Sequence, residues 1–278
     1  MRLRISLSLV LSITLTSCAP QRHVVSVLYA GSLITPIEGP IASALAHRGI
    51  TVQGEARGSN EIARLVVAGL RKPDVIVLVN PSVEANLENR NLIAESWTLG
   101  TTELGITWSG KSRFERLPVL SSRVCRNALA SGIAASCFVR LLATPGLRIA
   151  RTDPRLDPKG EYTVESVRML LGETAERRVL GSDENPQQTY PEEDLLVRLQ
   201  TGEADVGFVY KTEALARHLD FLPLPGRASL SGSILYTIAI MRGAAHPAAA
   251  KAFVDFLLHG AGKTILERAG LSSPSGAV

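Results

Sequence analysis

The sequence has few aromatic side chains, and its body contains no long apolar run. Phe, Trp and Tyr make up 5% of the 278 residues, which leaves little material for surfaces that stack against bases or sugars. The absence of an 18-residue apolar stretch excludes a polytopic membrane protein. The 30 Lys and Arg residues nearly balance the 26 Asp and Glu residues and are scattered, so the sequence predicts no nucleic-acid partner.

Motifs of common enzyme classes are also missing. The chain has no HExxH, GxSxG or CxxC motif. The Gly262-Lys263 pair lacks the glycine that a Walker A loop needs five residues earlier, where Leu257 stands. The histidines show no metal-ligand spacing; they are His23, His47, His218, His246 and His259. The sequence therefore predicts a protein that is not an enzyme and that carries no cofactor.

The first residues predict export. Arg2 and Arg4 precede an apolar segment at residues 5–15, which suits a signal peptide and is too short to span a bilayer. Cys18 follows Leu-Thr-Ser, which resembles the bacterial lipobox; an ordinary signal peptide with an incidental cysteine is the alternative. We therefore expect residues 1–17 to be a signal peptide. We expect lipid on Cys18 to hold the exported protein at a membrane, in the periplasm or at the cell surface.

Cleavage at this point would change the charge and the cysteine count. Loss of Arg2 and Arg4 lowers the formal net charge from +4 to +2. Cys125 and Cys137 remain, and they could pair in an oxidising compartment. Two buried free thiols are the alternative, because spacing alone does not set disulfide geometry.

The hydrophobic pattern beyond residue 23 alternates between strand and helix, which predicts an α/β protein. Strands are expected at 24–29, 51–56, 73–79, 104–108, 146–150, 205–210 and 233–242. Helices are expected at 36–48, 61–71, 163–176, 191–201, 211–219 and 247–269, the last broken near Gly260. Residues 151–160 are expected to form a loop.

This order suggests two lobes around a cleft. Residues 18–105 would form the first part of lobe one, residues 106–210 would form lobe two, and residues 211–278 would return to complete lobe one. Residues 104–108 and the segment from Lys211 onward would carry the chain between the lobes.

Three turns that lead from strands into helices could hold an anion. They cover residues 29–33, 57–61 and 153–162. The first two place Ser32 and Ser59 beside a glycine at the start of a helix, where unpaired N–H groups carry partial positive charge. A tetrahedral oxyanion fits such a place, although a serine there can also be a plain helix cap.

Six segments carry a resemblance to a known family. The segments are LYAGSL (28–33), ARGSNE (56–61), PDVIVLVN (73–80), TWSGKSRF (107–114), PGLRIARTDPRLDPKG (145–160) and LQTGEADVGFVYKTEAL (199–215). Together they resemble the molybdate/tungstate-binding proteins of ABC importers. The resemblance implies a type II periplasmic binding protein: a monomer with two α/β lobes and the ligand in the cleft. It also implies partners, namely a membrane permease and a separate ATPase.

The resemblance also implies a ligand site. Ser32 and Ser59 match the two ligand serines, and Tyr210 matches a tyrosine that closes the site. Gly160 and Tyr162 match a loop that offers N–H groups, with Glu161 inserted between them, and Asp157 matches an acidic position of the same loop. All the donors would be neutral, and the transported ligand would be molybdate or tungstate.

Several alternatives stay open. Val209 stands before Tyr210, where some members have a glutamate, so the sequence predicts tetrahedral recognition without a carboxylate on the metal. A sulfate or phosphate receptor would share the fold, and a phosphate site would gain from a buried carboxylate acceptor. A sensor or adaptor that has kept the fold is a further alternative. An exported enzyme would need a nucleophile and a base, and the sequence displays no such pair.

Overall fold

The computed structural model describes residues 23–114 and 134–273. The predicted signal peptide, Cys18 and Cys125 lie outside this part of the chain. Cys137 is buried and disulfide-bonded, and its partner also lies outside the described residues. Within the described ranges, no helix is both long enough and apolar enough to cross a bilayer.

Lobe one, as we call the part built on the first sheet, has five strands in the order β2-β1-β3-β9-β4. The strands are β1 (His23–Ala30), β2 (Ile50–Arg57), β3 (Val75–Val79), β4 (Ile93–Thr102) and β9 (Ile234–Met241). β1 runs parallel to β2 and β3, whereas β9 is antiparallel to both β3 and β4.

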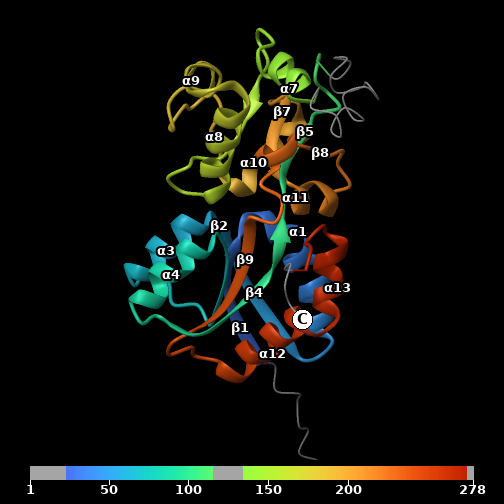
Figure 1. Ribbon diagram of the computed structural model, residues 1–278. Coiled ribbons are helices and arrows are strands. Elements are labelled where there is room, and N and C mark those ends of the chain that lie inside the picture. The colour runs from blue at the N-terminus through green and yellow to red at the C-terminus, as the bar shows by residue number, and fades with distance from the viewer. Residues whose placement is uncertain (1–22, 115–133, 274–278) are drawn as a thin grey trace, which may run out of the picture.

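Helices cover both faces of this sheet (Figure 1). One face carries α3 (Ser59–Val67) and α4 (Pro81–Asn89), and the other carries α12 (Pro247–Leu258) and α13 (Ala261–Arg268). Successive side chains of β1 enter different cores, because strand residues alternate in direction. Val27 packs in the core with α12 and α13, and Leu28 packs in the core with α3 and α4.

A broken helical segment follows β1. It consists of a 3-10 turn (Gly31–Leu33), α1 (Ile34–Pro36), a π-helical turn (Ile37–Ile41) and α2 (Ala42–Ala46). Pro40 lies inside the π-helical turn, where its missing N–H group cannot support a regular helix. The segment corresponds to the single helix that the sequence predicts at 36–48.

Lobe two is built on the second sheet, with the order β6-β7-β5-β8. Its strands are β5 (Leu104–Trp108), β6 (Ile149–Ala150), β7 (Val206–Tyr210) and β8 (Leu222–Pro223). The helical elements of this stretch are α7 (Ala134–Leu142), α8 (Pro158–Leu171), α9 (Glu173–Leu180), α10 (Glu192–Thr201), α11 (Lys211–Ala216) and a 3-10 turn at Gly226–Ser229.

The strand order brings the chain across between the sheets twice, between β4 and β5 and between β8 and β9. Residues 211–223 belong to both lobes: α11 contacts α1 and α13 of lobe one, and β8 pairs with β5 in lobe two. Figure 1 shows α11 at the junction of the two lobes. The predicted two-lobed α/β fold is confirmed.

One predicted loop differs from the structure. Residues 158–160, expected in a loop, form the first turn of α8. Asp157 caps this helix, because its Oδ1 accepts the N–H of Lys159 at 3.0 Å, and Pro158 suits the first helical position. The earlier helix start turns the side chain of Lys159 into the space between the lobes, where it becomes part of the site described next.

Candidate functional site

Two serines lie at neighbouring strand ends of lobe one. Ser32 follows β1, and Ser59 follows β2. Because β1 and β2 are parallel and pair along their whole length, their carboxyl ends meet at the same edge of the sheet. Both side chains are buried; Ser32 is 3% and Ser59 is 0% exposed.

The two hydroxyls have different partners. Ser32 Oγ accepts a hydrogen bond from the Tyr236 hydroxyl at 2.8 Å, and that hydroxyl lies 3.1 Å from Thr212 Oγ1. Ser59 Oγ accepts the N–H of Val79 at 2.9 Å. A hydroxyl that accepts one hydrogen bond can still donate another, so both serines keep the capacity to bind an oxyanion.

Lobe two approaches Ser59 closely. The N–H of Glu61 donates to the carbonyl of Leu156 at 3.1 Å, and Asn60 Nδ2 donates to Glu161 Oε1 at 2.7 Å. A Cβ on Gly58 would overlap the Leu156 carbonyl oxygen, so only glycine permits this approach. The lobes therefore touch around the predicted ligand position.

A pocket of about 300 Å³ opens beside this contact. Lobe one contributes Gly58 and Arg57 to its walls, and lobe two contributes Asp157, Glu192 and Glu193. Arg57 Nη1 lies 3.4 Å from Glu193 Oε1, which adds an ion pair between the lobes. Asp157 and Glu192, which are both buried, therefore border this pocket.

Four buried ionisable side chains gather between the lobes. They form what we call the charged cluster: Asp157, Lys159, Glu192 and Glu213. Lys159 Nζ lies 2.8 Å from Glu213 Oε1 and 3.3 Å from Glu192 Oε1. The second oxygen of Glu192 accepts the N–H of Gly31 at 2.7 Å. Glu192 thus connects lobe two to the strand end that carries Ser32.

Burial and charge set the protonation of this cluster. Burial, and after it the neighbouring Asp157, raises the pKa of Glu192 to about 8 against the opposing effect of Lys159. Burial also raises the pKa of Asp157 and of Glu213. Burial alone would lower the pKa of Lys159, but Glu213, Glu192 and Asp157 outweigh it and raise that pKa. The lysine is therefore charged at neutral pH.

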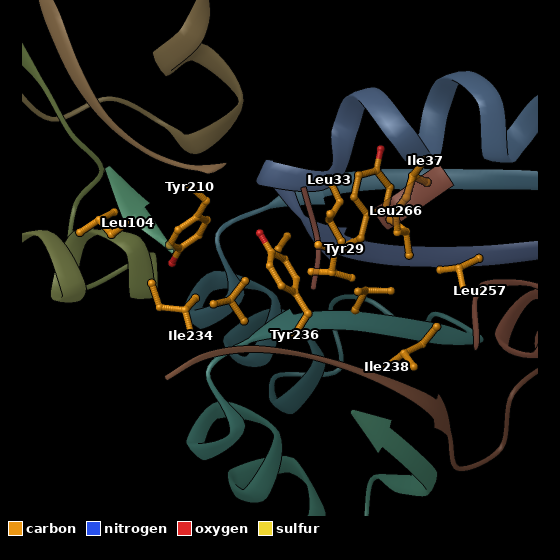
Figure 2. Close-up of a cluster of buried hydrophobic side chains, with 14 of the residues drawn as sticks. Tyr29, Leu33, Ile37, Leu104, Tyr210, Ile234, Tyr236, Ile238, Leu257 and Leu266 are labelled. Carbon is orange, nitrogen blue, oxygen red and sulfur yellow. The ribbon is translucent and has the colours of Figure 1, made fainter. Parts of the chain in front are cut away.

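Two tyrosines line the same region (Figure 2). Tyr210, at the end of β7, and Tyr236, in β9, are fully buried, with ring centroids 6.2 Å apart in an edge-to-face arrangement. The Tyr210 hydroxyl is buried without a hydrogen-bond partner among the described residues. Burial raises its pKa well above the ordinary value, so it stays a neutral donor.

The other predicted loop residues have local roles. Gly160 donates its N–H to the carbonyl of Asp157 at 3.0 Å, within the turn. Tyr162 lies on α8 and packs against the main hydrophobic core; burial and the nearby Glu161 raise its pKa to about 12. Asp157 Oδ2 is buried and has no hydrogen-bond partner in the described part of the chain.

The expectation that only neutral donors touch the ligand stays a prediction. The structure adds three buried ionisable residues near Ser32 that the sequence did not predict: Lys159, Glu192 and Glu213. Glu192 and Glu193 read as acidic residues that suit a helix start. The one sequence feature that could have pointed to Lys159 was its position two residues after Asp157, which the sequence did predict in the site. Among the described residues, no group of three or more His, Cys, Asp or Glu is arranged to hold a metal ion.

Comparison with known proteins gives this site a family context. A family described as bacterial extracellular solute-binding protein matches residues 25–272. The chain belongs to this family. A related solute-binding protein, a putative ABC transporter molybdenum-binding protein of Haloferax volcanii, is 29% identical over 212 residues. The match covers 74% of this chain and 61% of that protein, so the chain spans less than two thirds of the relative's length.

Solved structures of solute-binding proteins share the fold. The periplasmic molybdate-binding protein of Azotobacter vinelandii matches with a TM-score of 0.66 at 19% identity, over 90% of this chain and 100% of that chain. The sulfate-binding protein SubI of Mycobacterium tuberculosis matches with a TM-score of 0.58 at 16% identity, over 92% and 88%. At these identities the likeness shows the two-lobed fold alone.

Proposed function

We propose that this solute-binding protein captures a tetrahedral oxyanion, molybdate or tungstate, between its lobes and delivers it to an ABC importer. One observation carries the proposal: Ser32 and Ser59 are buried at adjacent parallel strand ends, directly under groups from lobe two. The similar proteins of Haloferax, putatively molybdenum-binding, and of Azotobacter, molybdate-binding, point to the same ligand class.

Binding would proceed through groups already in place. The serine hydroxyls, the Tyr210 hydroxyl and strand-end N–H groups would replace the water shell of the anion. Closure of the lobes would exclude solvent and strengthen each of these hydrogen bonds. Lys159 would add one positive charge close to the bound anion. No bond in the ligand is made or broken, so the proposed function needs no catalytic group.

We also propose that the protein works outside the cytoplasm as a lipoprotein. The predicted signal peptide and Cys18 would place it at a membrane surface, beside the permease and ATPase that take up the ligand. The family description, an extracellular solute-binding protein, agrees with export.

A second candidate ligand is hydrogen phosphate. It is favoured by Oδ2 of Asp157, a buried acceptor with no hydrogen-bond partner in residues 23–114 and 134–273, which could receive the proton of such an anion. Sulfate and molybdate carry no proton at neutral pH and would leave this oxygen unsatisfied or force Asp157 to be protonated. A direct comparison of ligands therefore separates the two candidates.

The test is a melting-temperature series of the purified protein with molybdate, tungstate, sulfate and phosphate. A ligand at about 100 times its Kd adds about 2.7 kcal/mol to the free energy of unfolding. We expect molybdate and tungstate to raise Tm. A rise with phosphate alone would favour the second candidate, and no rise with any of the four would refute an oxyanion receptor.

Alanine substitutions then locate the site. Ser32→Ala and Ser59→Ala should each weaken molybdate binding by about 1.5–3 kcal/mol, the range for a hydrogen bond to a charged group. Isothermal titration would measure the change. Ser43→Ala, on the exposed side of α2, is the control and should bind as the wild type does. Unchanged affinity in both site variants would place the ligand elsewhere.

A further inference from the structure

The carboxylate of Glu192 occupies the strand end where the oxyanion is expected. Its Oε2 accepts the N–H of Gly31 at 2.7 Å, next to Ser32, and its Oε1 lies 3.3 Å from Lys159 Nζ. The side chain is only 1% exposed. A Cβ on Gly31 would lie 2.9 Å from Oε2 and 3.0 Å from Cγ, so the missing side chain leaves the space that Glu192 fills.

A carboxylate resembles one edge of a tetrahedral oxyanion. Both present two oxygens that share negative charge, and both bind N–H and ammonium donors through charge-assisted hydrogen bonds. Glu192 comes from the first turn of α10 in lobe two, so its bond to Gly31 also joins the lobes. It therefore makes within the protein the kind of contact that a bound anion would make.

The charge of the cluster disfavours an ionised Glu192 and a bound oxyanion at the same time. The charged cluster holds three carboxyl groups against one ammonium group. Like charges repel strongly in a buried site, because little water screens them. Where Glu192 is ionised, above its pKa of about 8, a dianion that entered beside it would add to this negative charge and would find the Gly31 N–H already engaged.

We propose that Glu192 is an internal competitor that holds the ligand-binding N–H of Gly31 until an oxyanion displaces it. This inference rests on the proposed function and adds a step to it. Glu192 holds the empty lobes together through Gly31, gives way when the ligand binds, and returns when the ligand leaves. Its return would block rebinding while the permease takes up the anion, at the cost of weaker equilibrium affinity.

The test compares molybdate affinity in the wild type and in Glu192→Gln, at about pH 9 and about pH 6. Glutamine keeps the size of the side chain and removes the charge. At the higher pH, where Glu192 is ionised, we expect the Kd of the variant to be at least roughly tenfold lower. At the lower pH, the difference in Kd between the wild type and the variant should be smaller. The other titratable groups around Glu192 are common to both proteins: Asp157, Lys159, Glu213, Tyr210 and Tyr236.

The matched control is Glu193→Gln. Glu193 is the next residue of the same helical turn and pairs with Arg57 across the lobes at 3.4 Å, so its neutralisation removes a charge that does not contact the Gly31 N–H. Its affinity should stay close to that of the wild type. An equal Kd in Glu192→Gln at the higher pH would overturn the inference. A higher Kd would also overturn it and would indicate that Glu192 supports binding of the ligand. If neither wild type nor variant binds any oxyanion, the proposed function itself fails.

A second measurement needs no variant. In the ligand-free wild type, the amide proton of Gly31 should exchange slowly with solvent, because Glu192 accepts its hydrogen bond in a buried site. Amide exchange followed by NMR would show this directly. Fast exchange of that proton in the absence of ligand would overturn the inference even if Glu192→Gln does not fold.

Discussion

Ser59 has a structural role as well as a proposed ligand role. Its hydroxyl accepts the N–H of Val79, which is buried in β3. Ser59→Ala leaves this N–H without a partner, which should lower the free energy of unfolding by about 1–3 kcal/mol even without ligand. Chemical denaturation would measure the loss. Ser59→Thr keeps the hydroxyl and should lose less; equal losses in the two variants would contradict the assigned hydrogen bond.

Lys159 is the only cation of the charged cluster. Lys159→Met removes the ammonium and leaves Glu213 and Glu192 without their partner. We expect a loss of about 3–5 kcal/mol in unfolding free energy, the scale for breaking a buried ion pair on one side. Urea denaturation near neutral pH is the measurement.

A double variant supplies the control for Lys159. Lys159→Met with Glu213→Gln removes both partners of the 2.8 Å contact and should recover part of the loss, because no uncompensated charge remains at that contact. A double variant that is less stable than the sum of its single losses would contradict this account.

At the scale of secondary-structure elements, Asp74 lies just before β3 and connects that strand to β1 and α12. Its carboxylate accepts the N–H and the hydroxyl of Ser26 in β1, and the N–H of His246, which caps α12. Burial by itself would raise the pKa of Asp74, but these hydrogen bonds outweigh it and lower the pKa. The charged carboxylate therefore stabilises the packing of α12 on the sheet.

Because the pKa of Asp74 is lowered, the contribution of Asp74 to stability should fall as the solution becomes acidic. Because the pKa of Asp74 is lower in the folded state, its contribution to the free energy of unfolding is fully present above the unfolded-state pKa of about 3.9. That contribution is lost as pH falls through the folded-state pKa. Asp74→Asn should cost about 2 kcal/mol near neutral pH. The difference from wild type should shrink in acid, as measured by denaturation at several pH values. A constant difference down to about pH 2 would contradict the assignment.

Elements with clear local signals were predicted well. β1, β2, β3, β7 and β9 lie close to the expected ranges. β4 was missed, because it is an edge strand with two register shifts and does not alternate cleanly between apolar and polar residues. α4 was missed for a related reason, since its sequence PSVEANLEN contains few apolar residues.

At the scale of the whole molecule, lobe closure depends on Gly58. Its backbone adopts ordinary extended angles (φ −64°, ψ 141°), so alanine would fit within lobe one. The added Cβ would meet the Leu156 carbonyl of lobe two. Gly58→Ala should therefore push the lobes apart and lower oxyanion affinity by roughly tenfold or more.

Titration calorimetry would measure the loss of affinity in Gly58→Ala, and small-angle scattering would show whether the variant is more expanded than the wild type. Gly110→Ala is the matched control, since a Cβ there would meet nothing within 4 Å. Wild-type affinity in Gly58→Ala would show that ligand binding does not need the close approach of the lobes.

The residues that meet in the candidate site could be predicted only in part, because a local pattern cannot show contacts between residues far apart in the sequence. Ser32 and Ser59 sit in turns with a local signature, and a local signature can be read from the sequence. Glu192 and Gly31 are 161 residues apart, and Lys159 and Glu213 are 54 apart. No local pattern links such pairs, so the charged cluster could not be predicted.

The sequence by itself determined the α/β class, most strands, and the glycine–serine turns at the strand ends, because these depend on periodicity and on the backbone freedom of a few residues. Only the tertiary structure decided what lies opposite those turns. The approach of lobe two to lobe one brings Glu192 to the N–H of Gly31, next to Ser32, and Lys159 pairs with both Glu192 and Glu213. Burial raises the pKa of Glu192 at this contact.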